Sequence, residues 1–211
     1  MRNFVKGGCY ILIMLAMQVP LSAQKGDWNR KTTRDGRVQV LYKFTESTDK
    51  KGKKFNVLEY EASTTAKVSL ERCKAVMMDD TKHMEFMEGT EGVRRVKDIS
   101  DREWITYYFL NSRWPMPDAD VVTRYNLEED GRRVFILTGT PAPEMLPETQ
   151  VARMKHNHSK FTFADMGNGE VRITMYSKSI PLVSVPKWLI TTWIPDGPAD
   201  MLNGIIRLAG N

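Results

Sequence analysis

The feature that most constrains this chain is a succession of segments between residues 38 and 177 in which apolar and polar side chains alternate. Alternation with a period of two is typical of strands that bury one face. Turn signals such as Asp130-Gly131 separate several of these segments, as expected for antiparallel neighbours. The segments predicted as strands are 38–44, 55–65, 93–99, 103–110, 121–127, 132–138, 150–164 and 171–177.

Helical patterns accompany these strands in three places. Ser69 can cap a short helix that ends near Asp79, and a second short helix is expected over 81–87. Near the C-terminus, a helical region is expected over 186–208, with an apolar stripe of Met201, Leu202, Ile205 and Leu208. The expected fold is α+β: a curved antiparallel sheet wrapped around a long C-terminal helix, with two short helices, enclosing a hydrophobic cavity.

The first 23 residues are typical of an export signal. Arg2 and Lys6 precede an apolar run of 11 residues over 9–19, and a small-residue stretch ends at Ala23. The run is shorter than the ~20 residues that span a bilayer, so a cleaved signal peptide is favoured over an uncleaved anchor. We therefore expect a signal peptide over 1–23, a single domain over 24–211, and a secreted, periplasmic location.

Charge and cysteine content exclude some classes of protein. Beyond residue 23 the chain carries 29 Lys and Arg against 26 Asp and Glu, a net charge of +3. This mild charge argues against nucleic acid as a partner, because nucleic-acid binders carry a concentrated basic face. The basic cluster DKKGKK at 49–54 is expected to be a solvated loop between two strands. Cys73 is the only thiol beyond residue 23, so no internal disulfide can form.

Four motifs, in order along the chain, resemble those of a known family. They are DGRVQVLYKF at 35–44, WPMPDADVV at 114–122, VARM at 151–154 and VPKWLITTWIPDGPADMLNGIIR at 185–207. The chain from about Asp27 to Asn211 thus resembles the START (StAR-related lipid-transfer) domain, a branch of the Bet v 1-like helix-grip superfamily. The resemblance implies non-covalent binding of a lipid or other hydrophobic molecule in a cavity that the C-terminal helix gates, with no enzyme activity and no cofactor.

One position departs from the family pattern. The second motif has Ala119 where the family has an arginine, while Asp120 is kept. In some relatives that arginine points into the cavity and pairs with an acid or a ligand head group. Alanine there implies a less polar ligand, and the acid that would have paired with the arginine should be absent from the cavity or exposed, because a lone buried charge is costly.

The residues predicted to contact the ligand come from the strands and from the C-terminal region. Arg153 is the charged candidate and could meet a carboxylate or phosphate, although an outward, solvated arginine is equally compatible with the sequence. Trp188 and Trp193 could make transient contact with a membrane surface while a lid opens, or could belong to a fixed helix. The full set is Trp104, Tyr108, Trp114, Met116, Arg153, Met175, Trp188, Leu189, Trp193, Met201, Leu202 and Ile205.

Catalytic and metal-binding motifs are not evident. His156 and His158 lie two apart, but nothing nearby supplies a third ligand at a recognisable spacing, so no metal is expected. His83 is expected to be a partly exposed packing residue, and Cys73 a core thiol. Two alternatives stay open. The first is a cyclase- or hydratase-like cavity enzyme, which would require ionisable groups with shifted pKa values converging in the cavity. The second is an interaction module with a filled core, which would leave no void above about 100 Å³.

Overall fold

The structure is a computed structural model that describes residues 27–112 and 116–210. The predicted signal peptide therefore lies outside the described residues. Ten strands form one sheet in the order β1-β2-β3-β10-β9-β7-β6-β5-β4, with β8 beside β6. Their bounds are β1 Asn29–Thr32, β2 Gln39–Thr48, β3 Lys54–Lys67, β4 Thr90–Ser100, β5 Glu103–Leu110, β6 Ala119–Asp130, β7 Val134–Pro141, β8 Ala152–Met154, β9 Asn157–Gly167 and β10 Glu170–Ser179.

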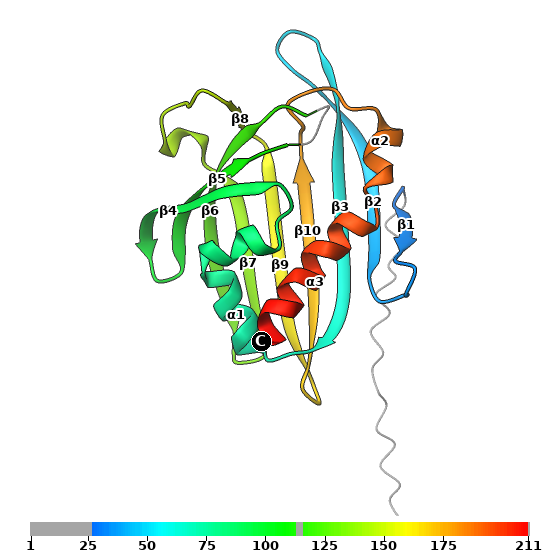
Figure 1. The fold of residues 1–211 in the computed structure, drawn as a ribbon, viewed down its shortest axis with the longest axis vertical. Helices are drawn as coiled ribbons and strands as arrows, with labels where there is room; N and C mark the ends of the chain where they lie inside the picture. Colours follow the sequence, from blue (N-terminus) through cyan, green and yellow to red (C-terminus); the bar gives the residue numbers. More distant parts are fainter. Residues whose placement is uncertain (1–26, 113–115, 211) are drawn as a thin grey trace, which may run out of the picture.

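The sheet is antiparallel except at β8 and curves behind the C-terminal helix (Figure 1). The helices are α1 Leu70–Met78, α2 Lys187–Thr192 and α3 Asp196–Gly210, with short 3-10 turns η1 Asp80–Glu85 and η2 Pro143–Met145. α3 crosses the concave face of the sheet and packs against α1 (Figure 1). These features match the α+β helix-grip architecture predicted from the sequence. Among the described residues, no helix has the length and apolar character needed to cross a membrane.

Local signals in the sequence account for several elements. The Ser69 hydroxyl accepts a hydrogen bond from the backbone N–H of Arg72, so the predicted cap of α1 is present. β5 spans the predicted residues, and Gly131 adopts a positive φ of 60° in the turn between β6 and β7. The basic loop at 49–54 joins β2 to β3, as expected.

The predicted long strand over 150–164 is wrong, because the chain changes neighbours within it. β7 leaves β6 at Pro141, so the start of β6 has a free edge. β8 pairs there in parallel, with Ala119 opposite Ala152. The chain then crosses to begin β9, which pairs with β7 and β10. This exchange of neighbours is a tertiary effect that local periodicity does not report.

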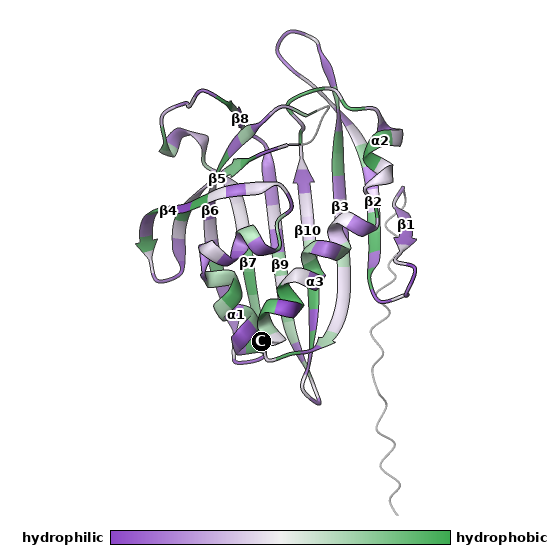
Figure 2. Ribbon diagram, viewed as in Figure 1, coloured by the Kyte–Doolittle hydropathy of each residue, from purple (hydrophilic) through white to green (hydrophobic). Residues whose placement is uncertain are grey.

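The C-terminal region forms two helices, α2 and α3. The helical conformation is interrupted at the cis peptide bond Ile194-Pro195, and α3 begins directly afterwards. A Cβ at Gly197 would lie 1.8 Å from the Trp193 ring, so only glycine allows this close turn between α2 and α3. α3 buries Leu202 and Ile205 completely against the sheet, whereas α2 has no buried residue. Figure 2 shows this apolar core on α1, α3 and the strands behind them.

Candidate functional site

A cavity of about 200 Å³ lies between the concave face of the sheet and the segment formed by α1, η1 and α3. Its walls come from distant parts of the chain that the curved sheet brings together. The lining residues are Tyr60, Met77, His83, Phe86, Met87, Tyr108, Leu110, Val121, Thr123, Tyr125, Met154, Asn157, Ser159, Phe161, Met175, Ser177, Ser179 and Met201. The lining is fully buried around Tyr108, Tyr125 and Met175 and half-buried around Met87, Asn157 and Ser179, which places the mouth at the latter end.

Two further hollows have larger volumes, of about 360 and 340 Å³. They are shallow depressions at the surface, and charged residues such as Lys74, Glu129 and Arg172 line them. Both are open to solvent and are lined in part by charged side chains, so neither is a candidate for a hydrophobic ligand.

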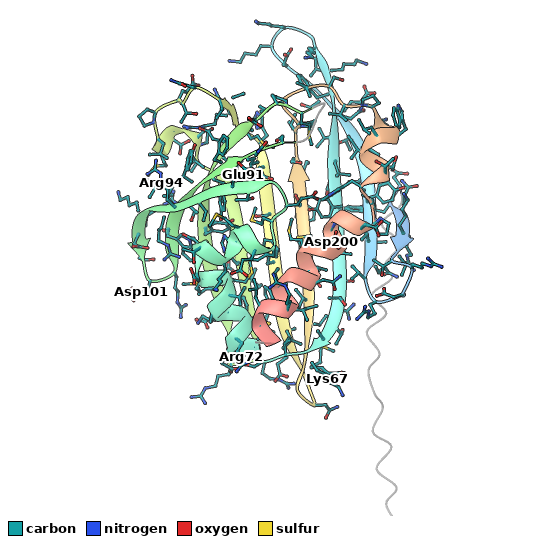
Figure 3. The ribbon with its side chains drawn as sticks, in the orientation of Figure 1. Lys67, Arg72, Glu91, Arg94, Asp101 and Asp200 are labelled. Carbon is teal, nitrogen blue, oxygen red and sulfur yellow. The ribbon has the colours of Figure 1, made fainter. Side chains whose placement is uncertain are left out.

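Among the residues that the structure describes, no Asp, Glu, Lys or Arg lines the cavity. Five of the lining residues are methionines, whose flexible thioethers can adapt to ligands of different shape. Lys67, Arg72 and Asp101 lie at the outside of the molecule, away from the cavity (Figure 3). Ala119 is buried on the cavity face of β6, and no acid among the described residues lines the cavity. The less polar ligand expected from Ala119 stays a prediction.

Three side chains form a hydrogen-bonded chain at the deep end of the cavity. His83 Nε2 lies 3.1 Å from the carbonyl oxygen of Met77, and His83 Nδ1 lies 2.6 Å from the Tyr108 hydroxyl. The Tyr108 and Tyr125 hydroxyl oxygens are 2.9 Å apart. η1 supplies the histidine, while β5 and β6 supply the tyrosines from directly adjacent strands.

Burial sets the protonation of this chain. Desolvation lowers the pKa of His83, so its imidazole is neutral at neutral pH. Desolvation raises the pKa of Tyr108 well above its ordinary value, and it also raises that of Tyr125. A third cavity tyrosine, Tyr60, has its pKa raised to about 12 by burial. All four groups are therefore uncharged.

Because these groups are neutral, only one assignment of hydrogen-bond donors and acceptors is consistent. A carbonyl oxygen only accepts, so Nε2 of His83 carries the imidazole proton and donates it to Met77. Nδ1 then accepts from the Tyr108 hydroxyl. Because Tyr108 has a single hydroxyl proton, the Tyr125 hydroxyl must donate to the Tyr108 oxygen. The chain therefore ends at the Tyr125 oxygen, on the cavity wall.

Arg153 does not line the cavity. It lies on the opposite, convex side of the sheet, where its guanidinium makes two 2.8 Å hydrogen bonds to the Asp120 carboxylate. Of the two orientations that the sequence allowed, the outward one is present, but the side chain is buried rather than solvated. The parallel pairing of β8 with β6 places these two residues directly opposite each other. Asp120 thus has an arginine partner despite Ala119.

The other predicted ligand contacts fall into three groups. Tyr108, Met175 and Met201 line the cavity. Trp104, Leu202 and Ile205 are buried in the core beside it, and Trp104 donates to the Asp80 carboxylate at 3.2 Å. The remaining described candidates lie nearer the surface: Trp193 packs edge-on against Tyr60, Leu189 is half-buried, Met116 is 46% exposed and Trp188 is 69% exposed. Trp114 lies outside the described residues.

Sequence reasoning missed the centre of the site. His83, expected to be partly exposed, is only 1% exposed. No sequence signal marked it, because its burial depends on how η1 packs against β5. Tyr125 did carry a signal, since it alternates with Val121 and Thr123 along one face of β6.

The remaining candidates for chemistry are isolated. Cys73 is fully buried, and burial raises its pKa to about 11, so it is an unreactive core thiol. His156 and His158 are both exposed. Over the described ranges, no three His, Cys, Asp or Glu residues lie close enough to hold a metal ion.

No family model matches the chain, but its fold is similar to those of several solved structures. A STAR-related lipid transfer protein from Xanthomonas axonopodis gives a TM-score of 0.73 at 18% identity, covering 88% of this chain and 100% of that chain. Human StAR-related lipid transfer protein 5 gives a TM-score of 0.69 at 11% identity, covering 89% and 88%. The Zhui aromatase/cyclase from Streptomyces sp. R1128 gives 0.54 at 9% identity, covering 73% and 94%.

In sequence, the chain is 22% identical over 196 residues to an uncharacterized protein of Pseudomonas aeruginosa, covering 92% of this chain and 93% of that protein. The structural likeness shows a START-like helix-grip fold. This fold is shared by lipid-transfer proteins and by an aromatase/cyclase.

Proposed function

We propose that this protein binds a lipid or other hydrophobic small molecule non-covalently in the cavity between the sheet and α3. The observation that carries the proposal is a buried cavity with an uncharged, methionine-rich lining. Affinity would come mainly from apolar surface removed from water, at about 25 cal/mol per Å². The lipid-transfer proteins of similar fold support this reading.

The size of the cavity bears on how a ligand enters. At about 200 Å³ it exceeds the void of a filled core, yet it is smaller than the roughly 300–1,000 Å³ of ordinary ligand pockets. A lipid-sized molecule therefore needs part of the wall to move. Moving all of α3 would expose Leu202 and Ile205, at about 1.5–3 kcal/mol for each side chain. In our proposal α2 and the segment before it open the mouth, while α3 stays in place.

We further propose transient contact with a membrane surface. The exposed Trp188 on α2 and the basic loop between β2 and β3 lie toward the same end of the molecule (Figure 1). Tryptophan favours the interface of a bilayer, and lysines favour its anionic head groups. Export to the periplasm is also part of the proposal, supported by the sequence of residues 1–23 alone.

A cavity enzyme is the second candidate function. His83, Tyr108 and Tyr125 are ionisable groups with shifted pKa values that converge on the cavity, which is the feature expected of an enzyme. The directions of the shifts favour binding instead. All three groups are held neutral, and protein atoms occupy both imidazole nitrogens, so no group is poised to take a proton from a substrate.

Native mass spectrometry of the protein purified from its own host, before and after solvent extraction, tests the binding proposal. We expect a stoichiometric apolar molecule that extraction removes. Ser177→Leu, which fills the cavity from β10, should reduce its occupancy, while Thr174→Leu on the other face of β10 should not. A protein that is empty in every preparation and takes up no fluorescent lipid would overturn the proposal.

A further inference from the structure

The deep end of the cavity contains an acceptor that no described residue uses. The order of hydrogen bonds from Tyr125 through Tyr108 to His83 consumes the proton of each hydroxyl. The Tyr125 oxygen donates inward to Tyr108 and, within the described part of the chain, accepts nothing in return. Because Tyr125 lines the cavity, its lone pairs face the space that a ligand would fill.

Thr123 supplies a second polar group at the same place. It is the neighbour of Tyr125 on the cavity face of β6 and also lines the cavity. Its hydroxyl has no hydrogen-bond partner within the ranges that the structure describes. A ligand group able both to donate and to accept would therefore find a partner for each role, Tyr125 for its proton and Thr123 for its oxygen.

The lining excludes two classes of head group. A carboxylate or phosphate would meet the lone pairs of Tyr125 and no Lys or Arg from the described part of the chain, so its charge would be buried without a partner there. A pure hydrocarbon would displace water from the Tyr125 oxygen without donating a hydrogen bond to it, which also weakens binding. A neutral hydroxyl avoids both penalties.

We propose that the Tyr125 oxygen accepts a hydrogen bond from a neutral hydroxyl group of the ligand, so that the natural ligand is a hydrophobic alcohol that binds with its hydroxyl end deepest. This inference rests on the proposed function, because it names the ligand class of the same cavity. The apolar part of the alcohol extends toward the mouth, past Met175 and Met201.

Two matched probes test the proposal without any substitution. 1-Octanol and its methyl ether have the same alkyl chain, but the ether cannot donate a hydrogen bond. Isothermal titration calorimetry of the wild-type protein should show the alcohol binding roughly tenfold more tightly, the effect of about one net hydrogen bond. Equal affinity for the two probes would overturn this inference and leave the binding function intact. Binding of neither probe would count against both the inference and the proposed function.

Two tyrosine variants test whether Tyr125 is responsible for the preference for the alcohol over the ether. In Tyr125→Phe the alcohol should lose most of its advantage while affinity for the ether is kept. Tyr60→Phe is the matched control, because Tyr60 also lines the cavity but belongs to the opposite wall, beside Trp193. It should keep the full preference for the alcohol. Loss of the preference in Tyr60→Phe but not in Tyr125→Phe would contradict the assignment to Tyr125.

Discussion

The two faces of β6 carry different kinds of buried polar group, a charged pair on one face and a neutral hydrogen-bonded chain on the other. On the convex face the Asp120 carboxylate is fully buried and charged, and it is paired with Arg153. On the concave face Tyr125 is also buried, but it belongs to a chain of neutral groups. The two residues lie five positions apart on one strand, so the difference arises from what packs on each face.

On the convex face, protein groups supply the hydrogen-bond partners of the Asp120–Arg153 pair. Arg153 donates to Asp120 and to the carbonyl oxygens of Pro143 and Leu146, and Thr149 donates to Asp120 at 2.7 Å. Burial alone would raise the pKa of Asp120, but the hydrogen bonds from Arg153 and Thr149 hold it below its usual value. The neutral chain ends instead at an unused acceptor in a cavity. The comparison indicates that the ion pair serves stability and the neutral chain serves a ligand.

The largest expected effect comes from breaking the ion pair. Arg153→Met leaves the Asp120 carboxylate buried without its partner, which should lower the free energy of unfolding by about 3–5 kcal/mol. Urea denaturation measures the loss. The double variant Asp120→Asn, Arg153→Met removes the charge as well and should recover part of the stability. A loss below about 1 kcal/mol in Arg153→Met would mean that the pair is solvated.

Breaking the neutral chain should have a smaller effect. His83→Leu leaves the Met77 carbonyl and the Tyr108 hydroxyl without their partner, at about 1–3 kcal/mol. The same urea denaturation measures it. Because no charge is stranded, the loss should be smaller than that in Arg153→Met. The reverse order would contradict the roles assigned to the two faces.

Mildly acidic pH should reduce the contribution of His83 to stability but not that of the Asp120–Arg153 pair. The pKa of His83 is lowered in the folded protein, so its contribution to stability is complete above the unfolded value of about 6.5 and is lost as the pH falls below it. The loss is at most about 1.4 kcal/mol per pH unit. The pKa of Asp120 is also lowered, so the ion pair is affected only below the unfolded aspartate value of about 3.9.

The stability difference between wild type and His83→Leu should therefore shrink from pH 7.5 to pH 5.5. Over the same range, the difference between wild type and the double variant Asp120→Asn, Arg153→Met should stay constant, because the pair titrates only at lower pH in the wild type and no carboxyl remains at position 120 in the double variant. Thermal unfolding at several pH values measures both differences. A difference for His83→Leu that does not change with pH would show that the pKa of His83 is the same in the folded and unfolded states, which contradicts the lowering by burial.

An exposed ion pair on the same convex face gives the smallest expected effect. Arg124 pairs with Glu103, but their side chains are 49% and 30% exposed. Arg124→Gln should cost at most about 1 kcal/mol, and less in high salt. Urea denaturation at low and high salt checks this, with Arg153→Met as the salt-insensitive counterpart. A cost equal to that of Arg153→Met would show that position on the strand, not burial, sets the energy.

Much of the fold could be predicted from the sequence because its signals are local. The Ser69 cap and the apolar face of α1 lie within a few residues of each other, and β5 has a clear boundary at each end. β1 was not predicted, because its sequence NRKT has no apolar alternation and it forms only by pairing with β2. β8 was merged with β9 because its parallel partner is far away along the chain.

The site was less predictable than the fold, for the same reason. Tyr108 and Met175 lie on the buried face of alternating strands, so their inward orientation was accessible from the sequence. Arg153 depends on the register of β8 against β6, and His83 depends on the packing of η1 against β5. Periodicity reports which face of an element is buried, but not which partner covers it.

The most direct test of the central claim is NMR of the methionine methyl groups during a titration with 1-octanol. Met77, Met87, Met154, Met175 and Met201 line the cavity, whereas Met84, Met145 and Met166 are exposed elsewhere. If the cavity binds hydrophobic alcohols, the first group should shift with saturation and the second should not. Shifts confined to the exposed methionines, or no saturable shift at all, would contradict binding in the cavity.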